Sequence, residues 1–406
     1  MTYDLSFINF SKLDNEEYNK ENNIKVKNIG SAFFNVKYVK KALNGNNYKT
    51  LGLCRSFLVD SGGNIVCFSP PKSLQYQYFT QDLKDSYIEE FVEGTMINMF
   101  YDKNTNDWEI TTRSTLGAKC KFNMDCDKTF RYMFLSTMNE IGLEFEDFDK
   151  NFCYSFVLQH PDNKIVLPIK KPRIILVDIF KCNGNKVDVI NRNMFHNQTH
   201  LFVKNDKIEK PALIIDYDKT KSLTEILKEL VYNKDYRCMG YYVHNNGERT
   251  KIRNPNYEHV KHLKGNSPKI QYQYYNLRQL NKVKDFLKFF PEHKQDFAVL
   301  RSNLHKYTQN LYKNYNDCYI HKVKPLKTYP YEYKTHMYHL HNLYLNDLKN
   351  DGGYVNFFVV KSYVNNLEPA RLMHVVNYPL KKDKFYQKKI IIENTIENEG
   401  NVSNNI

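Results

Sequence analysis

The chain has 406 residues, of which 41% are apolar and 26% charged, a balance that excludes a wholly disordered protein and is typical of globular domains. A chain of this length can bury a full core, and we expect it to hold two domains. Its net charge of +14 favours a polyanionic partner, either nucleic acid or an acidic membrane surface. A soluble basic protein without such a partner is the alternative.

Aromatic content favours nucleic acid among these partners. The sequence has 32 Tyr and 26 Phe but one Trp. Rings interleaved with Lys and Arg are how proteins stack and hold single-stranded nucleic acid. An AT-rich genome would also enrich Asn, Lys, Tyr and Ile, so this signal is weak when taken alone.

The sequence shows no sign of a membrane or secreted protein. No apolar run is long enough to span a bilayer, and the opening residues MTYDLSFINF lack the basic and apolar regions of a signal peptide. Eight cysteines without CxxC pairs are typical of reduced thiols, not of a disulfide framework or a zinc site. We expect a cytoplasmic protein without membrane attachment. A viral protein in the cytoplasm of its host would fit this expectation. The oligomeric state is left open.

Residues 30–265 are expected to form an α+β domain with an antiparallel sheet. Their β-prone runs, turn residues and helical spacings predict hairpins at 54–69 and 96–114 and helices at 129–142 and 223–232. Ser222 and Glu225 form a capping-box pattern at the start of the second helix.

One predicted strand carries a glycine in its middle. Residues 89–101, EEFVEGTMINMFY, have the apolar content of a strand, but Glu93-Gly94-Thr95 interrupts it. Glycine weakens a strand interior and marks a bulge or the close approach of another backbone or a ligand. We therefore expect something to approach the chain closely at Gly94.

A basic pair ends the predicted α+β domain. In the segment 240–266, a strand, a turn and a second strand place Lys251 and Arg253 on one face, because side chains two residues apart point the same way. Neighbouring cations repel unless an anion lies between them, and phosphate is the usual one. For this pair alone, a solvated strand face is the simpler interpretation.

After residue 266 the pattern becomes helical and basic. The stretches at 276–290 and 297–315 have 3.6-residue periodicity and few strand signals. We predict a domain over 1–266, a mainly α-helical basic domain over 267–382, and a flexible tail over 383–406.

The order of these features resembles the covalent nucleotidyltransferases, and within them the phage-type RNA ligases that repair broken RNA. The resemblance covers roughly residues 30–266 and rests on CRSFLVD, FSPPKS, FVEGT, the basic end of the second hairpin, the Gly-Tyr strand and the Lys-x-Arg pair. It implies an antiparallel-sheet, ligase-like domain that binds ATP and Mg²⁺, transfers AMP from a lysine to an RNA end, and joins strands. It also implies a helical domain that grips RNA.

The resemblance assigns roles residue by residue. Lys72 is the candidate nucleophile, displaced from the usual position, and neighbouring cations would lower its pKa. Glu93 is a candidate metal or ribose ligand. The candidates for nucleotide binding are Arg55, Glu93, Gly94, Thr95, Arg113, Lys251, Arg253 and Tyr257.

The sequence departs from the family pattern at three positions. Phe91 stands where the family has its nucleophilic lysine, and Val157 and Met239 replace two glutamates. Phenylalanine cannot form a phosphoramidate, and without carboxylates Mg²⁺ lacks its usual ligands. Two hypotheses therefore stay open: an active ATP-dependent RNA ligase that uses Lys72, and a protein that binds RNA or nucleotide without covalent chemistry.

Other patterns are better explained by structure than by chemistry. LIIDYDKTKS, with Asp216 and Asp218, matches the DxDxT signature of aspartyl phosphatases, but no parallel α/β pattern precedes it. His196 and His200 lack the glutamate of a zinc helix. The three histidines of THMYHLHNLY do not share one helical face.

Overall fold

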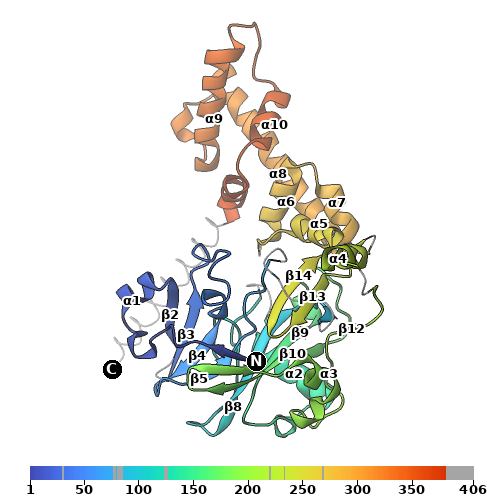
Figure 1. The fold of residues 1–406 in the computed structure, drawn as a ribbon. Helices are drawn as coiled ribbons and strands as arrows, with labels where there is room; N and C mark the ends of the chain where they lie inside the picture. The colour runs from blue at the N-terminus through green and yellow to red at the C-terminus, as the bar shows by residue number, and fades with distance from the viewer. Residues whose placement is uncertain are drawn as a thin grey trace, which may run out of the picture. The chain divides into compact units, whose positions relative to one another are not determined.

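The computed structural model describes residues 1–29, 32–75, 79, 86–122, 127–218, 221–232, 234–267 and 269–380. The chain divides into two compact units, Met1–Lys261 and His262–Ile406. Antiparallel sheets lie in the first unit, and the described part of the second unit is helical (Figure 1). The predicted combination of antiparallel sheets and a following helical region is confirmed. The domain boundary at residue 266 stays a prediction, and the tail predicted at 383–406 lies outside the described residues.

Three sheets build the first unit, in the orders β1-β11-β10-β9-β7-β8, β12-β6-β13-β14 and β2-β3-β4-β5. The strands are β1 Thr2–Asp4, β2 Ile24–Ile29, β3 Phe33–Tyr38, β4 Phe57–Asp60, β5 Ile65–Phe68, β6 Tyr87–Glu90, β7 Thr95–Asp102, β8 Asp107–Thr111, β9 Cys153–Gln159, β10 Arg173–Asn183, β11 Lys186–Val189, β12 Leu213–Ile214, β13 Gly240–Asn245 and β14 Glu248–Arg253. Each pair of neighbouring strands is antiparallel.

Helices flank these sheets and make up the described part of the second unit. The first unit contains α1 Glu16–Glu21, α2 Phe130–Ile141, α3 Arg192–Asn197 and α4 Leu223–Val231, and α5 Pro255–Lys264 spans the boundary. The second unit contains α6 Ile270–Gln279, α7 Val283–Phe289, α8 Lys294–Tyr315, α9 Tyr331–Leu343, α10 Phe357–Asn365 and a helix over 369–380. None of the described helices is long and apolar enough to cross a membrane.

Local sequence signals match most of these elements. Both predicted hairpins form, as β4–β5 and β7–β8. Gly142 ends α2 in the left-handed conformation, with φ 69°, and the Ser222–Glu225 capping box begins α4. The helical stretch expected at 276–290 is instead two helices, because Asn281 takes φ 55° between α6 and α7.

The single strand predicted over 89–101 is wrong. β6 ends at Glu90 and β7 begins at Thr95, and the two strands belong to different sheets. Gly94 has φ 156°, and a Cβ at this position would lie 2.5 Å from the carbonyl oxygen of Leu158. The close approach at this glycine therefore comes from β9, where the chain crosses from one sheet to the other.

The buried cores fix the ends of these strands. All seven residues of β9 are buried, and Phe134 of α2 packs against Phe156 with ring centroids 5.5 Å apart. On the sheet β12-β6-β13-β14, Ile88 and Val243 lie with Ile226 of α4 in one apolar cluster. Residues at the ends of β6, β13 and β14 are thus held by a close-packed interior.

Candidate phosphate-binding site

Three cations occupy alternate positions on one face of β14. The guanidinium of Arg249 lies 5.1 Å from the ring centroid of Tyr242, and Lys251 Nζ lies 5.0 Å from that of Phe91. The guanidinium of Arg253 lies 5.8 Å from the same Phe91 ring. Lys251 and Arg253 therefore share a face, as strand alternation predicts. Extending the same period by one step would have found Arg249, which our sequence analysis missed.

Phe91 is fixed where three strands meet. Its ring centroid lies 4.4 Å from that of Tyr242, and its backbone N–H donates to the carbonyl of Gly240 at 2.9 Å. A Cβ on Gly240 would lie 2.1 Å from the carbonyl oxygen of Ile252. Only glycine lets β13 and β14 come this close beside the Phe91 ring. Arg253, and Lys251 when it is protonated, gain cation–π attraction from this ring.

The segment that carries Lys72 runs beside β14. The Leu74 N–H donates to the carbonyl of Arg249 at 2.8 Å, and Thr250 Oγ1 donates to the carbonyl of Leu74 at 3.1 Å. The backbone N–H of Lys72 donates to the carbonyl of Gly52 at 3.0 Å. These bonds hold the segment that contains Lys72 beside β14, the strand that carries Arg249, Lys251 and Arg253.

Burial and the charges of neighbouring cations lower the pKa values of three basic side chains at this site. Burial first, and then Arg253, Lys72, Arg249 and Arg55, lower the pKa of Lys251 to about 6. Burial and then Arg55 and Arg253 lower the pKa of Lys72. The pKa of Arg55 falls to about 10, through burial and then Arg249. The structure thus groups five cations, which we call the cation cluster: Arg55, Lys72, Arg249, Lys251 and Arg253.

Carboxylates neutralise only part of the cation cluster. Arg249 pairs with Asp178 at 3.5 Å, and Arg253 pairs with Glu258 at 2.9 Å. Within the described ranges, no carboxylate lies within ion-pair distance of Arg55, Lys72 or Lys251. An anion bound beside these three would remove a repulsion that the protein itself leaves in place.

Arg113 lies at the margin of the cluster. Its side chain is exposed, and its backbone carbonyl accepts hydrogen bonds from Asn35 Nδ2 at 3.2 Å and Ser56 Oγ at 2.9 Å. Its charge contributes to the lowered pKa of Arg55, after burial and Arg249. Arg113 is therefore near enough to act on a ligand of the cluster electrostatically, and its direct contact with one stays a prediction.

Glu93 and Tyr257 form a buried clamp. Glu93 Oε1 accepts from the backbone N–H groups of Val166 at 3.0 Å and Leu167 at 2.9 Å, and its Oε2 accepts from the Tyr257 hydroxyl at 2.6 Å. The Tyr257 side chain has 0% exposure. These contacts support a role in holding the 91–94 loop, whereas contact of either residue with nucleotide stays a prediction.

The neighbouring candidates Gly94 and Thr95 also contact the protein itself. Gly94 lies against β9, and Thr95 Oγ1 accepts a hydrogen bond from Asn163 Nδ2 at 2.8 Å. Their assignment to nucleotide binding is likewise still a prediction.

The residues present do not fit a Mg²⁺ site. Both oxygens of Glu93 already accept hydrogen bonds, and the two positions where the family has glutamates hold Val157 and Met239, both buried. In the part of the chain that the structure describes, no group of three or more His, Cys, Asp or Glu side chains could hold a metal ion. Mg²⁺ prefers hard oxygen ligands, and none converge here.

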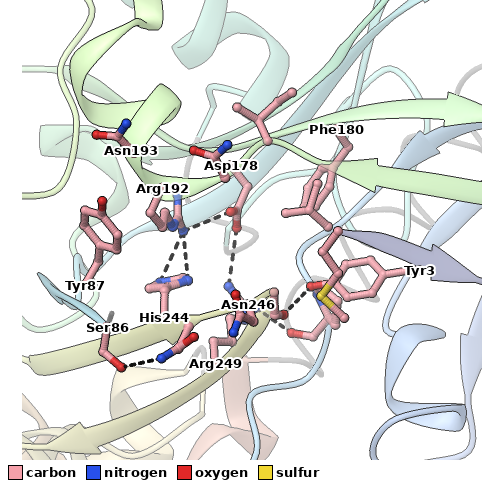
Figure 2. A pocket seen from close by; sticks show the side chains of 17 residues that line it. Tyr3, Ser86, Tyr87, Asp178, Phe180, Arg192, Asn193, His244, Asn246 and Arg249 are labelled. Atoms are coloured by element: carbon pink, nitrogen blue, oxygen red, sulfur yellow. Dashed lines mark hydrogen bonds and ion pairs between the residues drawn. The ribbon is translucent and has the colours of Figure 1, made fainter. Parts of the chain in front are cut away.

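A cavity of about 520 Å³ lies at the other end of the β13–β14 hairpin (Figure 2). Asp178, Arg192, His244 and Arg249 line it, and Arg192 Nη2 lies 2.9 Å from Asp178 Oδ1. Arg249 Nε is buried without a hydrogen-bond partner. This cavity shares Arg249 with the cation cluster, so the hairpin links the two places.

An ionic network lies beside this cavity. Glu89 is 2% exposed and lies 3.2 Å from Arg192 Nε and 2.9 Å from His196 Nε2. Although burial opposes ionisation, Arg192 and then His244 and His196 hold the pKa of Glu89 to about 2. His196 is thus a partner of a buried carboxylate, which supports the structural interpretation of the His196/His200 pattern.

The DxDxT pattern, the three-histidine helix and the cysteines also have structural explanations. The DxDxT pattern follows β12, an edge strand paired antiparallel with β6, which is not the parallel setting of aspartyl phosphatases. In the three-histidine helix, the Nδ1 of His336 lies 2.8 Å from the Tyr363 hydroxyl, and the His341 ring stacks on Tyr319 at 3.9 Å. The cysteines that the structure describes are free thiols.

Comparison with known proteins finds a phage RNA ligase among the curated proteins and ligases among the solved structures. The chain is 31% identical over 105 residues to an RNA ligase of Rhodothermus phage RM378, a match that covers 24% of this chain and 23% of that ligase. The chain is thus a distant homologue of a phage RNA ligase over about a quarter of its length. No family model matches the sequence.

The structural likenesses are distant. Two solved structures of an archaeal ATP-dependent RNA ligase match with TM-scores of 0.39 and 0.43, at 10% and 12% identity. They cover 92% and 72% of this chain, and 81% and 78% of their own chains. A putative ATP-dependent DNA ligase from Aquifex aeolicus matches with a TM-score of 0.38 at 10% identity, over 82% of this chain and 79% of its own. Scores this low carry no argument about fold or function.

Proposed function

We propose that the first unit binds the phosphates of a nucleotide, such as ATP, or of an RNA end through its cation cluster, without covalent chemistry. One observation carries the proposal: Arg55, Lys72 and Lys251 lie within electrostatic range of one another without a carboxylate partner among the described residues. A phosphate group presents the oxygens and the charge that such a set lacks.

The absence of a usual nucleophile supports binding over transfer. The RNA ligases that the sequence resembles have a lysine where this chain has Phe91. The Phe91 ring packs on the Tyr242 ring. The Phe91 ring has no group that could attack a phosphorus atom. Phe91 instead supports two phosphate-binding cations from below, since Lys251 and Arg253 both lie over its face.

RNA is the proposed macromolecular ligand. The net charge of +14 favours a polyanion, and the 105-residue match is to a protein whose name is RNA ligase. An RNA 5′-phosphate carries more negative charge than an internal phosphodiester. The crowded cations of the cluster therefore favour recognition of an RNA end, and in this proposal the chain binds ends as part of RNA repair.

Strand joining is the second candidate function. The lowered pKa of Lys72, caused by burial and by Arg55 and Arg253, supports it because a lysine must lose its proton to attack the α-phosphate of ATP. In that case Lys72 Nζ would bond to the α-phosphorus and pyrophosphate would leave. AMP would then pass to the RNA 5′-phosphate, and a 3′-hydroxyl would displace it.

One experiment separates these functions. The full chain is incubated with α-labelled ATP or GTP and Mg²⁺ and run on a denaturing gel, while the affinity for RNA with a 5′-phosphate or a 5′-hydroxyl is measured in parallel. We expect no labelled band, and a 5′-phosphate preference of about tenfold that Lys72→Ala abolishes. The exposed control variant Lys103→Ala should keep this preference.

Each alternative has its own outcome. A labelled band that disappears in Lys72→Ala would establish the nucleotidyltransferase and refute the non-covalent proposal. Equal affinity for both RNA ends, without a band, would refute phosphate recognition by the cluster.

A further inference from the structure

The second unit contains a basic groove of about 710 Å³, and all the residues that line it belong to this unit. It is lined from α6, α7, α8 and α10, and its charged side chains are all basic: Arg278, Lys284, Arg301 and Lys361, with His305 beside them. Among the described residues that line it, none is Asp or Glu. A surface helix face usually mixes both signs of charge, so a groove of one sign points to an anionic ligand.

Helical spacing directs these side chains into one place. Tyr274 and Arg278 are four residues apart on α6, as are Arg301 and His305 on α8, and Phe357 and Lys361 on α10. Residues four apart lie on the same face of a helix. Each of the three helices therefore presents a ring and a cation to the groove, because His305 supplies the ring of the α8 pair.

Contacts confirm that the pairs converge. The rings of His305 and Phe357 meet edge to face with centroids 6.1 Å apart, which joins α8 to α10. Burial raises the pKa of the Tyr274 hydroxyl, while Arg278 and Arg301 oppose the rise, so both guanidinium groups act at Tyr274. Arg278 Nη2 donates to Asn365 Oδ1, which ties α6 to α10.

The remaining cations are free to bind. Lys284, Arg301 and Lys361 are exposed, and in the described ranges none of them forms an ion pair. They line the same groove from three different helices, so a ligand with several negative charges could contact all three. The half-buried Phe357 ring offers a surface on which a base could stack.

We propose that this groove binds the backbone of single-stranded RNA, with Lys284, Arg301 and Lys361 on successive phosphates and Phe357 against a base. The proposal does not depend on the phosphate site of the first unit. An acidic protein segment could pair with the same cations but would make no use of the ring, and the test treats it as the opposing outcome.

The test uses the full chain and a labelled 12-nucleotide single-stranded RNA with a 5′-hydroxyl, so that recognition of a 5′-phosphate plays no part. Affinity is measured by fluorescence anisotropy over a series of KCl concentrations. The groove variant is Lys284→Ala/Arg301→Ala/Lys361→Ala. The matched control is Lys294→Ala/Lys306→Ala/Lys313→Ala, which removes the same charge from exposed positions of α8 outside the groove.

We expect the groove variant to lose at least about tenfold in affinity and the slope of log K against log[salt] to fall by about 2, since each lost phosphate contact removes about 0.7. The control should change neither quantity by more than about twofold. Phe357→Leu should weaken binding at every salt concentration and leave the slope unchanged.

Several results would overturn the proposal. Equal losses in the groove and control variants would show diffuse attraction by net charge. Unchanged binding in the groove variant, with circular dichroism confirming the fold, would exclude the groove. Polyglutamate that binds as tightly as the RNA and is insensitive to Phe357→Leu would assign the groove to an acidic protein partner.

Discussion

At Lys251 the protein holds a lysine among other cations and over an aromatic ring. Its pKa of about 6 means that the amine is mostly neutral at pH 7.5 while the site is empty. A bound phosphate would replace the missing counter-charge, and the amine would then regain its proton. Phosphate binding and proton uptake should therefore be coupled at this residue.

The coupling predicts how binding depends on pH. Because protons are taken up, affinity for tripolyphosphate should fall as pH rises above 6, by up to about tenfold per pH unit. Lys251→Arg keeps the charge at all these pH values, so its affinity should fall less steeply with pH than that of the wild type. Isothermal titration calorimetry at pH 7.5 in two buffers of different ionisation enthalpy should report up to about one proton taken up by the wild type.

The arginine variant also provides the contrary outcome. If wild type and Lys251→Arg show the same pH profile and the same proton uptake, Lys251 does not titrate on binding, and the cluster does not act through it.

Residue-level prediction succeeded where the cause was local and failed where a distant partner decided. The two-residue period of a strand predicted that Lys251 and Arg253 share a face. The same period extends to Arg249, but it could not show that the partner of Arg249 is Asp178 of β10, 71 positions away in the sequence. In the same way, nothing around Glu93 reveals that Tyr257 and the 166–167 backbone use both of its oxygens.

At the scale of elements, the loop between β6 and β7 is the junction of the candidate site. Its Phe91 supports the cations, its Glu93 is clamped, and its Gly94 lies against β9. The sequence showed a broken strand pattern here, but strand propensity alone cannot tell a bulge within one sheet from a crossing between two sheets. Only pairing with distant strands decides between them.

The clamp predicts a large loss of stability when it is removed. Glu93→Ala leaves the buried Val166 N–H and Tyr257 hydroxyl and the half-buried Leu167 N–H without this acceptor, and should lower the free energy of unfolding by about 3 kcal/mol or more. Tyr257→Phe removes one bond and should cost about 1 kcal/mol. Urea denaturation monitored by tryptophan fluorescence measures both, with the exposed Glu140→Ala as a control near zero.

The same measurement tests the alternative role of Glu93. If Glu93 were a metal ligand, Mg²⁺ would stabilise the wild type and not Glu93→Ala. Equal unfolding curves with and without Mg²⁺ are expected from the clamp.

Over the whole molecule, the class of fold was predictable and the strand pairing was not. Alternating short strands and later helical periods predicted antiparallel sheets followed by helices. The order β1-β11-β10-β9-β7-β8 places the first residues of the chain beside β11, and no local pattern around Thr2–Asp4 predicts that neighbour. The break at Asn281 was equally hidden, because asparagine is tolerated within helices as well as at left-handed positions.

Each unit has apolar packing of its own, so we expect the full chain to unfold in two thermal transitions. The first unit packs around β9 and α2, and the second around Phe286, Phe297 and Tyr274, with ring centroids about 5 Å apart. Tripolyphosphate at 100 times its Kd should stabilise the first unit by about 2.7 kcal/mol and leave the other transition in place. Differential scanning calorimetry measures both, and Glu93→Ala identifies the transition of the first unit because it should lower that one alone. A single transition would show that the two units unfold together. An equal shift of two separate transitions by the ligand would show that the phosphate site does not belong to the first unit alone.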